Sequence, residues 1–225
     1  MIDWNQIDTV LLDMDGTLLD LNYDFHFWSE HLPTCYAEAH QCSLEEAKNI
    51  ILTMVKEREG TLSWYCLDHW SSDLQLDIPA LKAEVAHLIQ ERPHCVKFLK
   101  WLKAEGKTSI LVTNSHQAGV DLKFKYSAIE PLLDFVYTSH QFKEPKESLA
   151  FWEQFHQHHP FNPERAVLID DNQHVLATAQ TFGIEHLLTI AQPNMAMPPG
   201  EEFKFPAINC YLNLISAHQE EPSHD

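Results

Sequence analysis

Five short apolar runs recur along the chain in a pattern typical of buried strands. They lie at Thr9–Leu12, Ser109–Thr113, Phe135–Thr138, Ala166–Ile169 and His186–Ile190. Apolar residues at consecutive positions indicate that both faces of each strand are covered. From the second run onward, the runs are separated by stretches with helical periodicity, at Gln117–Ile129, Lys146–Gln157 and Asn172–Phe182. The pattern predicts an α/β fold with a doubly wound, Rossmann-like parallel sheet.

The stretch between the first and second runs has helical periodicity and no strand pattern. Ser43 and Glu46 form a capping box for a helix that extends to Glu59. Pro79 suits the first turn of a further helix. This stretch is much longer than a simple connection between neighbouring strands requires.

We therefore expect two structural units. A helical cap domain is predicted at residues 21–93, inserted after the first strand. The α/β core is predicted at residues 1–20 and 94–225, with a helix at Cys95–Ala104 that brings the chain back to the sheet.

Composition narrows the class of partner. The 225 residues carry a formal charge of −18, which argues against a nucleic-acid polymer as partner because phosphate backbones are held by clusters of lysine and arginine. No apolar stretch reaches the roughly 18 residues of a membrane span, and the first residues, MIDWNQID, do not resemble an export signal. The five cysteines form no C-x-x-C pair. We expect a cytoplasmic protein with no membrane partner.

Carboxylates follow two of the predicted strands. Asp13 and Asp15 end the first run, and Asp170 and Asp171 end the fourth. Positions i and i+2 of an extended chain point to one side, and ligands of doubly wound folds bind at the carboxyl edge of the sheet. Carboxylates crowded at that edge need a cation, and Mg²⁺ is the natural oxygen-bound ion. A small phosphorylated substrate is compatible with such a site.

Neutral and cationic side chains complete the pattern. Thr113 and Asn114 end the second run, where their donors suit phosphate oxygens. Lys143 and Lys146 precede a helix, where an ammonium group could balance the charge of a phosphate and a carboxylate. The order D-x-D-G-T, T-N, Lys, D-D is far more specific than any one of these motifs.

These four segments resemble the signature of the haloacid dehalogenase-like hydrolase superfamily, over about residues 10–190. The resemblance implies an aspartyl-phosphate mechanism in which Asp13 is the nucleophile and Asp15 the general acid and base. It implies that Mg²⁺ is held by Asp13, the backbone carbonyl of Asp15, Asp170 and, directly or through water, Asp171. It implies that Thr113 and Asn114 bind phosphate and that Lys146 stabilises the developing charge.

The motif lysine departs from the superfamily pattern. Many members place it before the proline, whereas Lys146 follows Pro145. We prefer Lys146 because apolar helix positions follow it at suitable spacing, and Lys143 is the alternative.

The whole chain is similar to the purine 5′-nucleotidase branch, which acts on GMP and IMP. This similarity predicts a phosphomonoesterase that hydrolyses nucleoside 5′-monophosphates. The alternatives are a phosphatase or phosphomutase that acts on a sugar phosphate or another small phosphomonoester, and a non-catalytic module that binds Mg²⁺ or phosphate.

Several aromatic and histidine side chains allow two interpretations. The cap aromatics could stack on a purine, but helix packing is the more common role; they are Phe25, Phe27, Trp28, Trp64, Tyr65 and Trp70. His69 is expected to pack, and the role of His116, near the second motif, is open.

Overall fold

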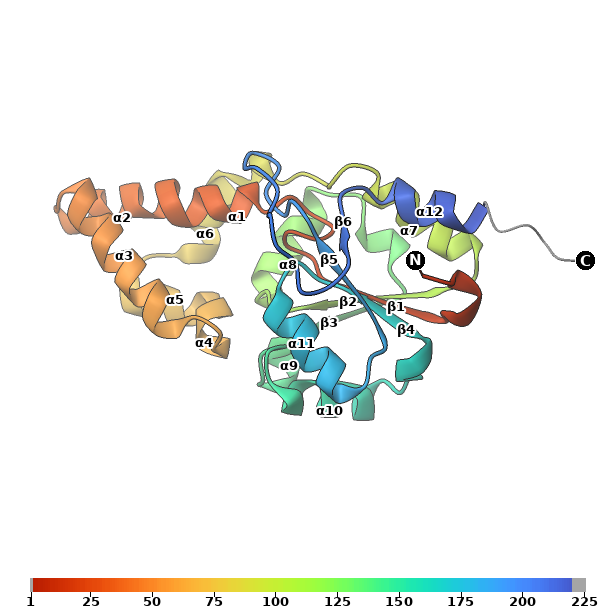
Figure 1. The fold of residues 1–225 in the computed structure, drawn as a ribbon. Coiled ribbons are helices and arrows are strands. Elements are labelled where there is room, and N and C mark those ends of the chain that lie inside the picture. Colours follow the sequence, from red (N-terminus) through yellow and green to blue (C-terminus); the bar gives the residue numbers. More distant parts are fainter. Residues whose placement is uncertain (1, 220–225) are drawn as a thin grey trace, which may run out of the picture.

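The computed structural model describes residues 2–219, and its centre is a six-stranded parallel sheet in the order β3-β2-β1-β4-β5-β6 (Figure 1). The strands are β1 (Thr9–Leu12), β2 (Thr108–Thr113), β3 (Phe135–Thr138), β4 (Ala166–Ile169), β5 (His186–Ile190) and β6 (Ala207–Ile208). The five predicted strands are confirmed, and β2 begins one residue early, at Thr108. The two-residue β6 was not predicted, because so short a segment carries no pattern.

Strand β1 lies at the point where the strand order reverses, between β2 and β4. Leu12 pairs with Leu111 on one side and with Ile169 on the other. The three strands therefore end at one level, which brings the residues that follow them to a common edge. Ligands bind at such a reversal in doubly wound folds.

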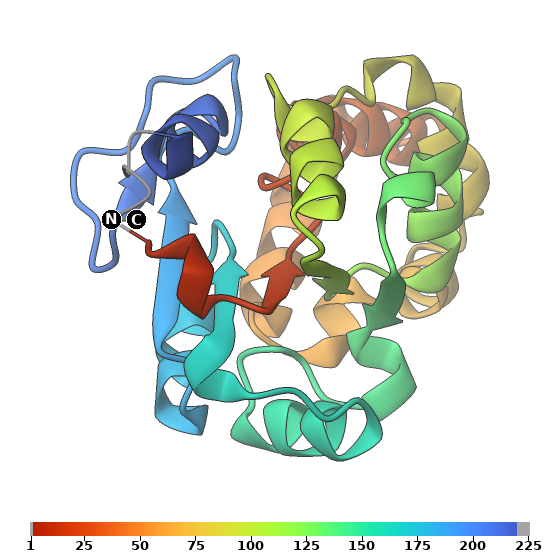
Figure 2. The same ribbon diagram turned by 90° about the vertical axis from the view of Figure 1, so that its right-hand side faces the viewer.

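Helices cover both faces of the sheet, as the two views in Figures 1 and 2 show. The core helices are α7 (Cys95–Ala104), α8 (Gln117–Lys125), α9 (Ser139–Phe142), α10 (Leu149–His158), α11 (Gln173–Phe182) and α12 (Leu212–Gln219). Alternate residues of β1 enter two separate apolar clusters: Val10 and Leu12 pack with α7 and α12, and Leu11 packs with α10 and α11. The predicted doubly wound α/β core is confirmed.

Two predicted helices differ from their expected bounds by three or four residues, because side chains bind backbone groups there, and the bounds of α3 and α11 differ by one residue. Helix α8 ends at Lys125 rather than Ile129, and the N–H of Ala128 donates to Glu91 Oε1 at 2.7 Å. Helix α10 begins at Leu149 rather than Lys146, since the N–H of Lys146 donates to Asn114 Oδ1 at 2.9 Å. Short 3₁₀ turns occupy Trp4–Gln6, Ala86–Leu88, Glu130–Leu132 and Pro163–Arg165.

Between β1 and α7 the described chain forms helices that extend away from the sheet (Figure 1). They are α1 (Asn22–His26), a π-turn (Phe27–His31), α2 (Leu32–His40), α3 (Leu44–Arg58), α4 (Leu62–Tyr65), α5 (Leu67–Leu74) and α6 (Ile78–Glu84). Ser43 caps α3 by accepting from the N–H of Glu46 at 3.2 Å, and Pro79 lies in the first turn of α6. The division into a cap at residues 21–93 and a core stays a prediction.

The two connections between these helices and the sheet lie side by side. The N–H of Asp20 donates to the carbonyl of Gln90 at 2.9 Å, and that of Arg92 donates to Leu18 at 2.9 Å. Both connections therefore approach the sheet beside the end of β1.

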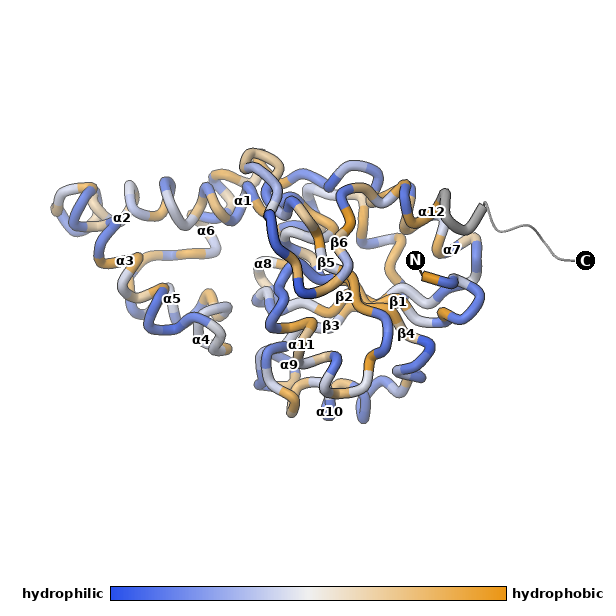
Figure 3. Tube along the Cα trace, in the orientation of Figure 1, coloured by the Kyte–Doolittle hydropathy of each residue, from blue (hydrophilic) through white to orange (hydrophobic). Residues whose placement is uncertain are grey.

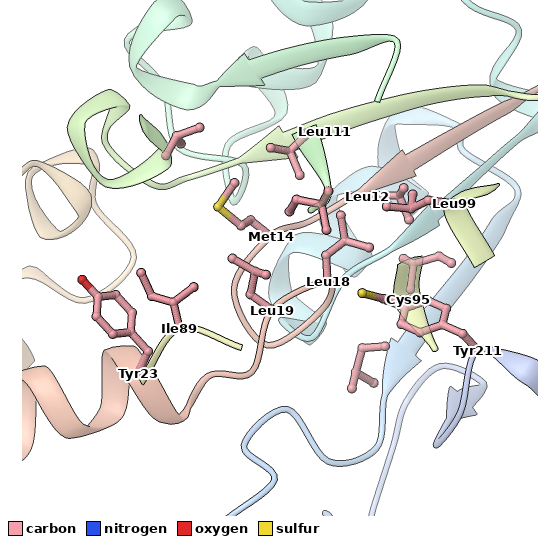
Figure 4. Close-up of a cluster of buried hydrophobic side chains, with 14 of the residues drawn as sticks. Leu12, Met14, Leu18, Leu19, Tyr23, Ile89, Cys95, Leu99, Leu111 and Tyr211 are labelled. Atoms are coloured by element: carbon pink, nitrogen blue, oxygen red, sulfur yellow. The ribbon is translucent and has the colours of Figure 1, made fainter. Parts of the chain in front are cut away.

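The apolar core extends to the residues that follow β1. Met14 is fully buried, and Figure 4 shows it with Leu12, Leu18 and Leu19 in one cluster. Figure 3, coloured by hydropathy, shows hydrophobic residues along the strands of the sheet. Because Met14 enters the core, its neighbours Asp13 and Asp15 are free to face the edge of the sheet.

None of the helices within residues 2–219 has the length and apolar character that a membrane crossing requires. The five cysteines are free thiols.

Candidate active site

Asp13 and Asp170 are joined by one buried ammonium group. Lys146 Nζ lies 2.5 Å from Asp13 Oδ1 and 2.6 Å from Asp170 Oδ2, and it also donates to the carbonyl of Val112 at 3.0 Å. Burial raises the pKa of Asp13 to about 6, against the opposing effect of Lys146. Burial also raises the pKa of Asp170. Three of the predicted site residues therefore meet at the carboxyl edge of the sheet.

Asp171 adds a third carboxylate to this group. One oxygen each of Asp13, Asp170 and Asp171 lies within 4.8 Å of the others. Burial, followed by the charges of Asp13 and Asp170, raises the pKa of Asp171 well above its usual value. With all three carboxylates ionised, the ammonium group of Lys146 leaves a charge of −2, which a divalent cation would balance.

Gly16 shapes the space beside these carboxylates. Its φ is +78°, and a Cβ atom there would lie 2.4 Å from Asp171 Oδ2. Only glycine allows the turn to pass so close to the carboxylate. The oxygen donors, their charge and this close turn fit a hard cation such as Mg²⁺.

The Asp15 side chain has different partners. Its Oδ1 lies 2.5 Å from Lys123 Nζ, and its Oδ2 accepts from Ser115 Oγ at 2.6 Å. Burial raises the pKa of Asp15, and the charge of Lys123 opposes the shift. The two motif aspartates therefore lie in adjacent but separate ion-pair groups, a division that the i and i+2 spacing does not reveal.

A chain of buried ion pairs continues from Asp15 toward the helices between β1 and β2. Lys123 Nζ donates to Asp24 Oδ2 at 2.8 Å, and Lys82 Nζ donates to Asp24 Oδ1 at 2.7 Å. Burial raises the pKa of Asp24, but the two lysines outweigh it and hold the pKa below its usual value. Asp15, Lys123, Asp24 and Lys82 thus join α8, α1 and α6 through four alternating charges.

Thr113 and Asn114 lie at the end of β2, next to Lys146. Thr113 Oγ1 accepts from the N–H of Ser115 at 3.0 Å. Asn114 Oδ1 accepts from the N–H of Lys146, and its Nδ2 donates to Glu147 Oε2 at 2.9 Å. The Asn114 side chain orients the lysine segment here, and the phosphate role predicted for both residues stays a prediction.

The two candidate lysines, Lys146 and Lys143, differ clearly in burial. The side chain of Lys146 is 2% exposed and enters the carboxylate cluster. Lys143 is exposed, with a left-handed backbone (φ 58°). The geometry favours Lys146 as the motif lysine.

Glu147 was not singled out in the sequence. Its carboxylate accepts from Asn114, from Asn172 Nδ2 at 3.2 Å and from the Tyr65 hydroxyl at 2.7 Å. The feature of the sequence that could have identified Glu147 is its position directly after Lys146. Ser115, Lys123, Asp24 and Lys82 were also missed, because sequence spacing does not show which distant charges become neighbours.

A cavity of about 650 Å³ opens beside Asp15 and Lys123. Its lining is mainly apolar and comes from all of the helices α1 to α6, the π-turn and α8. The aromatic residues in the lining are Phe25, Trp28, Trp64 and Tyr65. Phe27 and Trp70 are fully buried and pack, as expected, whereas the packing role expected for His69 is wrong because this residue is exposed.

Comparison with known proteins identifies the family. A model described as haloacid dehalogenase-like hydrolase matches residues 10–189. The chain belongs to this family. It is therefore an enzyme of the hydrolase class, and the family membership predicted from the four motifs is confirmed.

Relatives and solved structures agree with this assignment. The chain is 36% identical over 214 residues to the GMP/IMP nucleotidase YrfG of Escherichia coli (strain K12). The alignment covers 95% of this chain and 96% of the relative. The GMP/IMP nucleotidase YrfG of Shigella flexneri matches with the same identity and coverage. A HAD phosphatase structure from Thermococcus onnurineus has a TM-score of 0.78 at 20% identity, covering 94% of this chain and 97% of the other. A putative beta-phosphoglucomutase from Thermotoga maritima has a TM-score of 0.68 at 16% identity, covering 96% of this chain and 100% of the other.

Proposed function

We propose that this hydrolase is a Mg²⁺-dependent phosphomonoesterase whose substrates are purine nucleoside 5′-monophosphates, with GMP and IMP preferred. The identity of 36% to a GMP/IMP nucleotidase over 95% of the chain carries the proposal. The carboxylate and lysine cluster supports the phosphatase chemistry, and the cavity beside Asp15 supports a substrate larger than phosphate alone.

In the first step, Asp13 attacks the phosphorus atom and the bond to the leaving oxygen breaks. Asp15 gives a proton to that oxygen, so that the nucleoside leaves as a neutral alcohol. In the second step, water attacks the phosphorus atom of the aspartyl phosphate and gives a proton to Asp15, while the bond between phosphorus and the Asp13 oxygen breaks. Phosphate is released, and both side chains return to their starting states.

The surrounding residues hold these groups in place. Lys146 fixes Asp13 and provides positive charge where charge develops on the phosphoryl oxygens. Lys123 and Ser115 orient the Asp15 carboxylate. Mg²⁺ would be held by Asp13, Asp170, Asp171 and the backbone carbonyl of Asp15, and when bound it neutralises phosphoryl charge. Thr113 and Asn114 are the proposed phosphate donors.

The cavity accounts for selectivity in this proposal. The phosphoryl-binding residues contact a group that all phosphomonoesters share, so discrimination depends on the remainder of the substrate. Phe25, Trp28, Trp64 and Tyr65 offer flat faces beside Asp15. Stacking of a base on such a ring contributes about 1–3 kcal/mol, by analogy with single-stranded nucleic acids.

The alternatives have less support. A sugar-phosphate phosphatase or phosphomutase has the same core, but the likeness to the phosphoglucomutase structure is 16% in sequence and concerns the fold. A non-catalytic binding module does not require a complete set of nucleophile, acid and cation. The cytoplasmic location and the absence of membrane and nucleic-acid partners stay predictions.

The experiment is a comparison of kcat/KM for IMP, GMP, UMP and glucose 6-phosphate, by phosphate release, with Mg²⁺ and with EDTA. IMP and GMP should lead the series by roughly 10- to 100-fold. Activity should disappear with EDTA and return when Mg²⁺ is restored. A sugar phosphate at the head of the series would overturn the nucleotidase assignment, and turnover unaffected by EDTA would overturn the role of the metal.

A further inference from the structure

A second group of metal-ligating side chains lies beside the cavity. It combines Cys66, which caps the start of α5, with His116, which caps the start of α8, and His140 of α9. One ligand atom from each lies within 4.8 Å of the others, and all three side chains are half-buried. His116 also lines the cavity, as do Tyr65 and Leu67 on either side of Cys66.

His140 is the member of this group that requires explanation. Both of its ring nitrogens are buried and have no hydrogen-bond partner. A buried polar group without a partner costs about 1–3 kcal/mol. Its ring lies edge-on to that of His116, with 5.0 Å between the centroids. Burial, followed by the charge of His116, lowers the pKa of His140 to about 4, so that the ring is neutral and able to bind a metal at pH 7.

We propose that Cys66, His116 and His140 form a binding site for a divalent transition metal of the Zn²⁺ type, separate from the carboxylate site. One thiolate and two imidazoles are ligands that Zn²⁺ prefers, whereas Mg²⁺ takes oxygen. A tetrahedral zinc ion holds such ligands about 3.3–3.6 Å apart, so ligand atoms within 4.8 Å of one another would have to move together by at most about 1 Å.

The neighbouring groups allow this movement at small cost. His116 Nδ1 accepts from the N–H of Ala118 over 3.4 Å, a long bond that a bound metal can replace. Asp68 Oδ2 lies 3.6 Å from His116 Nε2, where it can provide a fourth ligand or hold a metal-bound water.

Another cluster, of His31, Cys35 and Glu84, has similar ligand types but is a weaker candidate. His31 Nε2 lies 3.0 Å from Glu84 Oε2 and 3.7 Å from Cys35 Sγ. These groups satisfy one another, whereas His140 has no partner. The contrast favours the site at Cys66.

The proposed site joins two parts of the fold. Cys66 belongs to the helices between β1 and β2, and His116 and His140 belong to helices that follow β2 and β3. A metal held by all three would fix α5 against α8 and α9 at the rim of the cavity. Inhibition of turnover by Zn²⁺ is the expected consequence, and it rests on the proposed function, whereas binding itself does not.

Co²⁺ is the probe, because a cobalt–thiolate bond gives a near-ultraviolet charge-transfer band that carboxylate ligands do not give. The full-length, metal-free protein is titrated with Co²⁺ under reducing conditions, and Zn²⁺ is then added. We expect one equivalent of Co²⁺ to produce the band and Zn²⁺ to remove it. Absence of a band at saturating Co²⁺ would overturn the proposal.

Three variants assign the band. Cys66→Ser should abolish it, and His140→Ala should weaken Co²⁺ affinity by about 100-fold or more, as loss of a ligand exceeds the effect of a supporting residue. Cys35→Ser is the matched control and should keep the band. A band lost in Cys35→Ser but kept in Cys66→Ser would overturn the assignment in favour of the other cluster. Circular dichroism of each variant checks that the fold is kept. His140→Asn replaces His140→Ala, and Cys66→Ala replaces Cys66→Ser, if either fails to fold.

Discussion

The ammonium group of Lys123 lies 2.5 Å from Asp15 Oδ1, although the two residues are 108 positions apart in the sequence. Asp15 therefore shares its buried cation with Asp24 of α1, which in turn contacts Lys82 of α6. The proposed acid and base is thus connected through charge to the helices that line the cavity.

We expect Lys123→Met to reduce kcat by about 100-fold, a typical contribution of a positioned acid and base. Loss of the ammonium group raises the pKa of Asp15 further. Because breakdown of the aspartyl phosphate requires ionised Asp15, the acidic limb of the kcat profile should move to higher pH. The measurement is a pH profile with IMP. Lys125→Met, an exposed lysine of the same helix, is the control, and coincident profiles for the two variants would rule out the positioning role.

We expect Gly16→Ala to weaken the response to Mg²⁺. The added methyl group would lie 2.4 Å from Asp171 Oδ2 in a backbone with φ +78°, so the carboxylate must move. Gly106→Ala is the matched control, because its φ is +67° and its Cβ meets nothing within 4 Å. Both variants should lose about 1 kcal/mol of stability from the left-handed backbone. The Mg²⁺ concentration for half-maximal activity should rise in Gly16→Ala alone, and an equal rise in both would contradict this account.

We expect Asp13→Asn to lose at least about 1,000-fold in kcat, because the nucleophile is removed. The same change should stabilise the metal-free protein at pH 7. The folded-state pKa of Asp13 is about 6, above its ordinary 3.8, so the folded protein binds more protons than the unfolded chain between these values. The native carboxyl therefore destabilises the fold by about 2–3 kcal/mol above pH 6 and ceases to do so as the pH falls to about 4.

Urea unfolding of the metal-free proteins at pH 7 and pH 4 measures this difference. Asp13→Asn should be the more stable protein at pH 7 and equal to the native chain near pH 4. Asp121→Asn, at an exposed position, should match the native chain at both values. If Asp13→Asn were less stable than the native chain at pH 7, the ion pair between Asp13 and Lys146 would stabilise the fold by more than burial of the Asp13 charge destabilises it.

We expect Phe25→Ala to weaken turnover of a purine nucleotide relative to p-nitrophenyl phosphate. The Phe25 side chain lines the cavity and is 46% exposed, so its removal should cost little stability. Loss of one stacking face should lower kcat/KM for IMP by roughly 5- to 100-fold and leave that for p-nitrophenyl phosphate unchanged. Tyr126→Ala, which removes an exposed aromatic residue outside the cavity lining, is the control. An equal decrease in kcat/KM for both substrates would show that Phe25 supports the structure and does not recognise the base.

The sequence predicted the sheet well because burial on both faces leaves continuous apolar runs. It also indicated which strands carry chemistry, since Asp13 and Asp170 each follow such a run. Helix ends were less predictable: α8 and α10 have different bounds because Glu91 and Asn114 bind backbone groups from distant segments. Local periodicity contains no information on these partners.

The candidate site shows the same limit. Asp13, Asp170, Asp171 and Lys146 cluster as expected, whereas the Asp15 side chain lies in a neighbouring ion-pair group. The residues that hold these groups in place were not recognised. In the sequence, Lys123 has the pattern of an ordinary surface lysine on a helix, and nothing distinguishes Asp24. Only the tertiary structure shows that Lys123 binds both Asp15 and Asp24. Glu147 lies next to the motif lysine, yet its contacts with Asn114, Asn172 and Tyr65 come from three separate segments.

The π-turn at Phe27–His31 has a consequence for the shape of the cavity. Leu21, Phe25, Ser29 and Pro33 all line it, at intervals of four residues. In a regular α-helix three such intervals drift by about 120° around the axis, and one residue wound in as a π-turn takes back up to about 100° of that drift. Deletion of a single residue within Phe27–His31 would let the segment become a regular α-helix that still directs Pro33 toward the cavity, whereas a regular α-helix of the present length would turn Pro33 and the rest of α2 away from it. The π-turn therefore absorbs one surplus residue and keeps the start of α2 on the cavity wall.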